Sequence, residues 1–295
     1  MNDVLHLACG GDRGYLEHTA ATVASFLEHS GDLQLHVHYL HPPGLATADR
    51  SLFERFIEQA GATASLVAVP DDLIEGLPAA FNHVTVAMWY RIFLPSLLPD
   101  VQRVLYVDAD TLAMNDIRPL WDSDLGGKTL GAVANIFEPW NAGYARALGL
   151  SSPYFNSGVL LLDLARMRAT GAGDELRRYA VEHHSELTWP DQDALNIVLG
   201  EECVALDPRW NCMNSLFAFE AASDVFGAEA VAEARARPGV RHFEGPSVNK
   251  PWHYLCRAAH RAEYFRQRAR TPWPRVRIEG RTLRNVVWRA RQRRR

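Results

Sequence analysis

The stretch RVLYVDADTLAMNDIRPLW, residues 103–121, places two carboxylates directly behind an apolar run. The run 103–107 predicts a buried strand, and side chains at i and i+2 of an extended chain point to the same side. Asp108 and Asp110 are therefore expected to converge on one cation. Because buried carboxylates without a partner are costly, a metal-binding or nucleophilic role is favoured over a helix cap or a chance pattern.

This D-x-D pattern behind a strand fits two reaction classes. In phosphatases of the haloacid-dehalogenase type, the first Asp is a nucleophile and the second an acid or base. In glycosyltransferases that use nucleotide sugars, both acids hold a divalent metal on a diphosphate. The motif by itself leaves both classes open.

The rest of the chain favours the second class. Strands are predicted at 3–9, 33–40, 62–70, 129–135, 157–164 and 239–243, and helices at 15–29, 48–60, 85–98 (bent or ended by Pro95), 139–148, 174–184 and 191–199, with a loop region at 210–219. This alternation predicts an α/β fold with a mostly parallel sheet that is covered on both faces. Three strands precede Asp108, whereas the phosphatase needs its nucleophile strand first.

A second segment, RHFEGPSVNKPWH (residues 241–253), supplies the complementary groups. His242 offers an imidazole nitrogen, and a mixed carboxylate and imidazole set suits Mn²⁺ better than Ca²⁺. Gly245 allows close approach of the backbone to a phosphate. Lys250, one of only two lysines in the chain, provides a compact positive charge for a leaving diphosphate.

Composition bounds the class of protein. The chain has 295 residues, of which 47% are hydrophobic and 22% charged, and this is enough for a sizeable core. No stretch approaches a membrane span, and the N-terminus does not resemble a signal peptide. The four scattered cysteines suit a reducing compartment. We therefore expect a cytoplasmic protein.

Charge divides the chain in two. Residues 257–295 contain 14 Arg against two acids, a net charge of +12, and residues 1–256 carry −16. We predict a catalytic domain at 1–256 and a basic extension at 257–295. Arginine mixed with Leu283, Val286, Val287 and Trp288 fits attachment to an anionic membrane surface. Nucleic acid is not expected as a partner, because the acidic body would repel it.

Four segments in order resemble glycosyltransferase family 8, the retaining enzymes related to bacterial lipopolysaccharide galactosyl- and glucosyltransferases and to glycogenin. They are LYVDADTLAMNDIRPLW (105–121), FNSGVLLLDL (155–164), WPDQDALN (189–196) and RHFEGPSVNKPWH (241–253). The similarity spans roughly residues 4–256. It implies a GT-A fold with one Rossmann-like nucleotide-sugar-binding domain, a UDP-sugar donor carrying glucose or galactose, and Mn²⁺ or Mg²⁺.

The resemblance also implies a set of site residues. The metal ligands would be Asp108, Asp110 and His242, and the diphosphate would be clamped by Gly245 and Lys250. The remaining donor-binding positions are Asp12 and Tyr15 for the uracil, Ala109 within the D-x-D motif, Arg91, Asn156 and Asp191 for the sugar, and Gln192 on its reacting face.

The implied reaction retains the configuration of the sugar. Gln192 is a poor nucleophile, so attack from the face that the leaving group vacates is favoured over a covalent intermediate on Asp191. The acceptor would be a glycan, a lipid-linked sugar or a small molecule. A non-catalytic nucleotide-sugar-binding protein is a further alternative, because the spacing between Gly245 and Lys250 is longer than is usual in the family. Asn135 also stands where related galactosyltransferases have an acid.

Overall fold

The computed structural model describes residues 4–78, 85–137 and 143–292. A seven-stranded sheet with the order β3-β2-β1-β4-β7-β6-β8 forms the centre, and β5 pairs with β9 in a second, two-stranded sheet. The strands are β1 (Val4–Gly10), β2 (Gln34–His41), β3 (Thr63–Ala68), β4 (Arg103–Val107), β5 (Thr111–Ala113), β6 (Leu130–Ala134), β7 (Phe155–Asp163), β8 (Cys203–Ala205) and β9 (Val240–His242).

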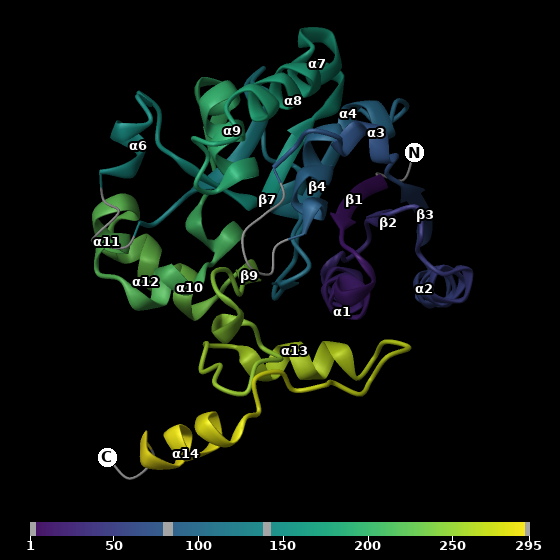
Figure 1. Ribbon diagram of the computed structural model, residues 1–295, viewed down its shortest axis with the longest axis vertical. Coiled ribbons are helices and arrows are strands. Elements are labelled where there is room, and N and C mark those ends of the chain that lie inside the picture. The colour runs from purple at the N-terminus through teal and green to yellow at the C-terminus, as the bar shows by residue number, and fades with distance from the viewer. Residues whose placement is uncertain (1–3, 79–84, 138–142, 293–295) are drawn as a thin grey trace.

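The directions of the strands determine which loops lie at the same edge of the sheet. In the large sheet, β7 is antiparallel to its neighbours β4 and β6, whereas the other neighbouring pairs are parallel. The predicted α/β fold with a mostly parallel mixed sheet is thus confirmed. β1 and β4 are adjacent and parallel, so their carboxyl ends, at Gly10 and Val107, open on the same edge of the sheet. Figure 1 shows these two strands side by side.

Some of the helices pack on the two faces of the sheet and others lie outside it. The helices are α1 (Arg13–His29), α2 (Thr47–Gln59), α3 (Asp71–Ile74), η1 (Val86–Phe93), α4 (Leu94–Leu97), α5 (Arg118–Trp121), α6 (Tyr144–Ala147), α7 (Leu164–Thr170), α8 (Ala172–Glu182), α9 (Pro190–Leu199), η3 (Gly200–Glu202), η4 (Pro208–Asn211), α10 (Asn214–Ala218), α11 (Ala221–Phe226), α12 (Ala228–Ala236), η5 (Ser247–Asn249), α13 (Arg261–Arg268) and α14 (Leu283–Gln292).

The helix predicted at 85–98, bent or ended by Pro95, is a 3₁₀ helix at residues 86–93 followed by α4, which begins at Leu94 with Pro95 in its first turn. Pro95 has no N–H to continue an α-helical ladder back to Arg91, which explains the change at that point. The prediction of a loop at 210–219 was wrong, because this region contains the second half of η4 and all of α10. Residues 139–142 of the helix predicted at 139–148 lie outside the described part of the chain, and α6 lies within its remainder.

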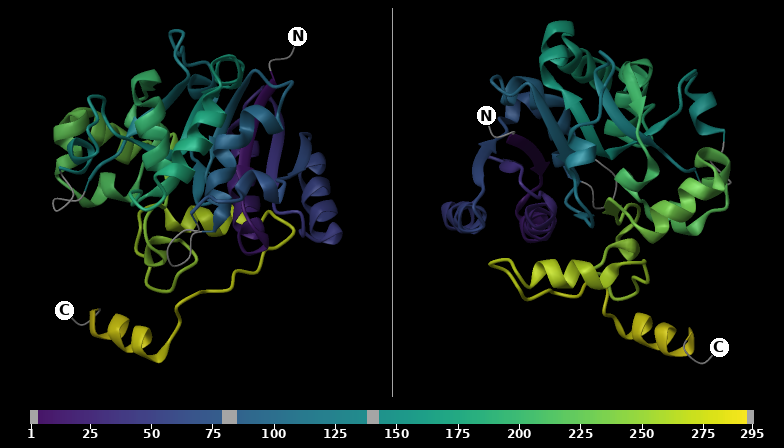
Figure 2. Two further views of the ribbon diagram at one scale, coloured as in Figure 1. Left: turned by 45° about the horizontal axis from the view of Figure 1, so that its top comes forward. Right: turned by 180° about the vertical axis from the view of Figure 1, so that it is seen from behind.

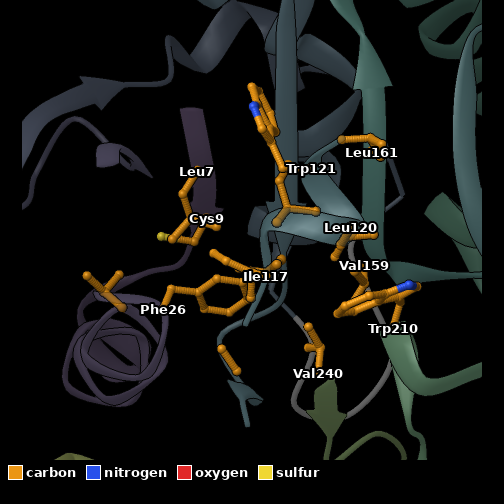
Figure 3. Packing of buried hydrophobic residues seen from close by; sticks show 14 of the residues in the cluster. Leu7, Cys9, Phe26, Ile117, Leu120, Trp121, Val159, Leu161, Trp210 and Val240 are labelled. Carbon is orange, nitrogen blue, oxygen red and sulfur yellow. The ribbon is translucent and has the colours of Figure 1, made fainter. Parts of the chain in front are cut away.

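Two apolar layers hold the sheet. One includes the inward residues of α1 and α2 together with one face of β1, β2 and β4, and the other packs η1, α4, α7, α8 and α9 on the opposite face. Figure 3 shows part of the first layer, where side chains from α1, β1, the 117–121 turn, β7 and β9 meet: Phe26, Leu7, Cys9, Ile117, Leu120, Trp121, Val159, Leu161 and Val240. This packing draws α1 and β9 toward the carboxyl ends of the strands.

The basic C-terminal segment behaves as two parts. α13 packs on α1: Tyr264 and Arg268 are buried, the Tyr264 hydroxyl lies 2.6 Å from His18 Nδ1, and Arg268 pairs with Glu17. α14 has no buried residue and extends away from the sheet, as Figures 1 and 2 show. Among the described residues, no helix has the length and apolar character needed to cross a bilayer.

Three histidines share one face of the β1–β2 pair. His6 Nδ1 lies 2.9 Å from His38 Nε2, and the rings of His36 and His38 are 4.5 Å apart. Burial, followed by the charges of His36 and His6, lowers the pKa of His38 to about 3. Burial also lowers the pKa values of His6 and His36. This cluster is therefore neutral in the folded protein at neutral pH.

We expect the free energy of unfolding to fall as the pH drops from 7 to 5. The unfolded chain titrates its histidines near pH 6.5, so below that pH it binds more protons than the folded chain does, and acid favours unfolding. His38 alone should account for about 2 kcal/mol of this loss. Urea unfolding at both pH values measures it in the wild type and in His38→Gln. An unchanged pH dependence in the variant would contradict the assignment.

Candidate active site

A cleft of about 1260 Å³ opens at the carboxyl ends of β1 and β4. Every site residue predicted from the sequence lines it except Asp12: Tyr15, Arg91, Asp108, Ala109, Asp110, Asn156, Asp191, Gln192, His242, Gly245 and Lys250. These residues come from widely separated segments, so the fold brings together parts of the four sequence motifs with Tyr15 and Arg91, which lie outside them. Asn135 also lines the cleft.

The two acids of the D-x-D motif lie in a turn and not on a strand. β4 ends at Val107, and the Thr111 N–H and hydroxyl both bond to the Asp108 carbonyl, at 3.1 and 2.7 Å. The predicted i, i+2 alternation of an extended chain was therefore the wrong reason for their convergence. The turn itself folds both side chains toward His242. On the other side of the turn, the Thr22 hydroxyl of α1 bonds to the Ala109 carbonyl at 3.0 Å.

Asp108, Asp110 and His242 form a cluster whose ligand atoms all lie within 4.8 Å of one another. His242 Nε2 is 3.3 Å from Asp110 Oδ1 and 3.9 Å from Asp108 Oδ2. The other ring nitrogen, Nδ1, faces Asn211 Oδ1 at 2.9 Å. An amide oxygen only accepts, so Nδ1 carries the proton and Nε2 presents a lone pair to the two acids.

A short chain of amides supports this histidine. Asn211, fully buried, donates from Nδ2 to Asn156 Oδ1 at 2.8 Å, and the same oxygen accepts from the Gly158 N–H at 3.0 Å. Asn156 Nδ2 in turn donates to Gln192 Oε1 at 3.0 Å. The imidazole of His242 is thus oriented from β7 through two side chains. Sequence reasoning missed Asn211, because nothing in its local pattern separates it from an ordinary turn residue.

Arg91 connects two of the acids from beneath. Its guanidinium donates to Asp108 Oδ1 at 2.8 Å and to the Ser157 carbonyl at 2.5 Å, and its Nε lies 3.3 Å from Asp191 Oδ2. Burial alone would lower the pKa of Arg91, but Asp108, Tyr106 and Asp191 raise it overall. Burial raises the pKa of Asp191, and Arg91 opposes that effect. Arg91 therefore holds a fixed positive charge between two carboxylates.

Lys250 reaches the cluster from the other side. Its amine bonds to Asp110 Oδ2 and to the Phe243 carbonyl, the latter at 3.1 Å. Burial would lower the pKa of Lys250, but Asp110 raises it, so the amine stays charged. Burial would likewise raise the pKa of Asp110, but the positive charge of Lys250 lowers it.

The additional residues between Gly245 and Lys250 form the 3₁₀ turn η5. The Asn249 N–H bonds to the Pro246 carbonyl at 2.8 Å, and the Lys250 N–H bonds to the Ser247 carbonyl at 3.1 Å. Gly245 begins this turn with φ of +90°, a conformation that other residues rarely adopt. The turn returns Lys250 to the acids despite the additional residues.

At the other end of the cleft, Asp12 and Tyr15 begin α1. The Asp12 carboxylate accepts the N–H groups of Gly14 and Tyr15, at 2.8 and 3.2 Å, and so caps the helix. The Tyr15 ring stands edge-on to Trp252, with centroids 6.1 Å apart, and it borders the cleft. Trp252 is buried and also stacks on His18. The segment that carries Lys250 is therefore packed against α1.

The third motif, WPDQDALN, places Asp191 and Gln192 in the first turn of α9. Gln192 Oε1 accepts the Ser157 N–H at 3.0 Å, and the Ser157 hydroxyl donates to Asp191 Oδ2 at 3.1 Å. Ser157 was missed at the sequence level, although it stands within the quoted FNSG segment. The FNSGVLLLDL segment was interpreted as a core strand in which only Asn156 touches ligand, and the contacts of Ser157 with Arg91 and α9 give it a place in the site.

A model of glycosyl transferase family 8 matches residues 6–256, and the chain belongs to this family. General stress protein A of Bacillus subtilis is 27% identical over 92% of this chain and 96% of its own length. The lipopolysaccharide 1,3-galactosyltransferase of Salmonella typhimurium is 26% identical over 92% of this chain and 80% of its own. Lipopolysaccharide glucosyltransferase WaaO of Escherichia coli is 26% identical over 85% of this chain and 74% of its own.

A solved structure resembles the fold as a whole. Galactosyltransferase LgtC, in complex with donor and acceptor sugar analogues, superposes with a TM-score of 0.81 at 24% identity, covering 91% of this chain and 96% of that one. The predicted GT-A fold is confirmed by this likeness. Family membership makes the chain a glycosyltransferase and gives no support to the phosphatase or to the non-catalytic binding protein considered from the sequence.

Gly158 is predicted to be indispensable, because β7 passes directly behind the cluster. A Cβ at this position would lie 2.3 Å from His242 Cε1 and 2.8 Å from Asp108 Oδ2, closer than real contacts allow. We expect Gly158→Ala to destabilise the fold by about 1–3 kcal/mol and to displace His242. Thermal unfolding measures the first effect and glycosyltransferase activity the second. Gly44→Ala, where an added Cβ meets nothing within 4 Å, is the matched control.

Proposed function

We propose that this chain is a retaining, metal-dependent glycosyltransferase that moves a hexose, glucose or galactose, from a UDP-sugar to a glycan, a lipid-linked sugar or a small-molecule acceptor. The observation that carries the proposal is the cluster of Asp108, Asp110 and His242 at the carboxyl end of β4, flanked by Lys250. The names of the lipopolysaccharide transferases among the relatives support a sugar acceptor.

The donor set fits a divalent cation. Two carboxylates and an imidazole with its lone pair directed at them suit Mn²⁺, and Mg²⁺ is the alternative. The gaps of 3.3 and 3.9 Å between His242 Nε2 and the acids are wider than ordinary hydrogen bonds and leave space for a shared ion. Asp108, Asp110 and His242 would hold the ion, which when bound supplies positive charge to the donor diphosphate.

The protein's own charges would stabilise the departing UDP. Lys250 lies on Asp110 and would move from that carboxylate to the diphosphate when the donor binds. Gly245 leaves the backbone of the turn free of a side chain where the phosphates would approach. Tyr15 would stack on the uracil. Asp12, fixed as the cap of α1, would read the edge of that base.

Same-face attack is favoured over a double displacement. The Asp191 carboxylate is held by Arg91 at 3.3 Å and by the Ser157 hydroxyl at 3.1 Å, so it is committed to an ion pair rather than free to attack. In the proposed path, the leaving phosphate oxygen accepts the proton of the acceptor hydroxyl. Gln192 borders the reacting face, and its fixed amide dipole stabilises positive charge that develops on the sugar.

The test is the release of UDP from a panel of UDP-sugars, with Mn²⁺ and with a chelator, in the absence of acceptor. We expect slow hydrolysis of one donor that stops when the metal is removed. Asp110→Asn should lower this rate about 100-fold, because it removes both a metal ligand and the partner of Lys250. Asp122→Asn, an exposed acid outside the cleft, should leave the rate unchanged.

The other outcomes point elsewhere. UDP that binds with Mn²⁺ but is released from no donor, even with acceptors present, would indicate a binding protein. Hydrolysis that continues undiminished in the chelator would contradict the metal proposal and leave the transferase class intact. Failure to bind UDP at all would overturn the donor assignment.

We propose further that α14 attaches the enzyme to an anionic membrane surface on the cytoplasmic side. Leu283 and Val287 are four residues apart on one face of this helix and are 82% and 42% exposed. Arg284 and Arg291 belong to the same helix and add positive charge. An exposed apolar face with arginines around it suits an interface between acyl chains and acidic headgroups.

Vesicle co-sedimentation measures this attachment. The wild type should bind vesicles that contain acidic phospholipid and bind neutral ones much less. Leu283→Glu combined with Val287→Glu should abolish binding, because it removes apolar contact and adds negative charge. Val225→Glu is the matched control, since Val225 is 47% exposed but lies on α11. Equal binding by the wild type and the double variant would refute the role of α14.

A further inference from the structure

Asp193 is a buried carboxylate that the proposed reaction does not use. It is fully buried in the first turn of α9, next to Gln192, and both of its oxygens accept hydrogen bonds. Its Oδ1 accepts the Tyr154 hydroxyl at 2.5 Å. Its Oδ2 accepts the Tyr144 hydroxyl at 2.7 Å and the N–H groups of Thr188 and Trp189 at 2.8 and 2.9 Å.

The hydrogen bonds connect Asp193 to Gln192 through Tyr154, and the order of donors and acceptors along this connection is fixed. Gln192 Oε1 accepts the Ser157 backbone N–H, which can only donate, so the opposite end of the amide is Nε2. Nε2 donates to the Tyr154 hydroxyl oxygen at 3.2 Å, and the Tyr154 hydroxyl donates its own hydrogen bond to Asp193. Burial, and then the charge of Asp193, raise the pKa of Tyr154, so the hydroxyl keeps this proton.

We propose that Asp193 and Tyr154 are positioning residues that fix the amide dipole of Gln192 on the reacting face. Donors on β7 hold the oxygen end, and the Asp193–Tyr154 pair holds the nitrogen end. A flipped amide would bring N–H against N–H at Ser157 and leave Tyr154 without a donor. This inference rests on the proposed function, because it concerns the sugar that Gln192 would face.

Tyr144 provides a matched comparison within the structure. Both tyrosines donate to Asp193, but only Tyr154 also accepts from Gln192. Tyr154→Phe should lower kcat about 10-fold, with KM for the UDP-sugar changed by less than about twofold, because one hydrogen bond that orients the amide is lost. Tyr144→Phe should change kcat by less than about threefold. Equal losses of kcat, or a loss that appears in KM, would overturn the proposal.

A double-mutant cycle tests whether Tyr154 acts through Gln192. When Gln192 is already Ala, Tyr154→Phe should cause no further fall in kcat. The same 10-fold loss in that background would show that Tyr154 acts independently and would overturn the proposal.

Asp193→Asn gives a second test with nearly unchanged shape. The Thr188 and Trp189 N–H groups require an oxygen at their side, so the new amide nitrogen would face Tyr154 and donate to it. The Tyr154 proton would then turn toward Gln192 Nε2 and force the amide from its position. We expect Asp193→Asn to lower kcat more than Tyr154→Phe does, and the combined variant to regain activity relative to Asp193→Asn alone.

The combined variant separates positioning from simple stability. Additional loss in the Asp193→Asn, Tyr154→Phe protein would overturn the proposal, since two structural defects would add. The assay of the wild type separates failure of the proposed function from failure of this inference. If the wild type turns over no UDP-sugar, both are refuted. If the wild type is active but Tyr154→Phe and Tyr144→Phe lower kcat equally, only the inference about Asp193 and Tyr154 is refuted.

Discussion

The ion pairs of Arg91 are the constraint on which the site depends. Three carboxylates, Asp108, Asp110 and Asp191, gather at the edge of the sheet, and their mutual repulsion would open the cleft if they were uncompensated. Arg91 pairs with two of them, Asp108 and Asp191, from within the core, and Lys250 pairs with Asp110 from the rim. Buried charges are tolerated only when each is paired and hydrogen-bonded. The hydrogen bonds that Arg91 donates to the carbonyl and hydroxyl of Ser157 help to meet this requirement.

The backbone of β7 and helix α1 both lie close against the turn that carries Asp108 and Asp110. β7 runs antiparallel beside β4, and the Asp108 N–H bonds to the Gly158 carbonyl at 2.8 Å, where a larger residue would collide with His242. On the other side, α1 contacts the same turn through Thr22 and Ser25, whose hydroxyls bond to the backbone at Ala109 and Ala113. The backbone that carries the two acids is therefore held by contacts on both sides.

Much of the fold followed from local pattern. The strands β1, β2, β3 and β4 and the helices α1 and α2 lie where apolar periodicity predicted them, within a residue or two at most ends. The segment of η1 was predicted as a helix that Pro95 bends or ends, and the structure shows that this helix is of the 3₁₀ type. The conformation of η1 is linked to the hydrogen bonds of Arg91, which it carries. These bonds join residues that are far apart in the chain, so no local pattern contains them.

By itself, the sequence determined the family, the order of the strands along the chain and the residue types at the site, because these depend on motifs and on alternation along short segments. Only the tertiary structure decided how the acids converge, since they meet in a turn that is fixed by Thr111 and β7 rather than along a strand. It also revealed Asn211 behind His242 and Asp193 behind Gln192. Hydrogen bonds between residues far apart in the chain create these roles, and such bonds leave no local sequence signal.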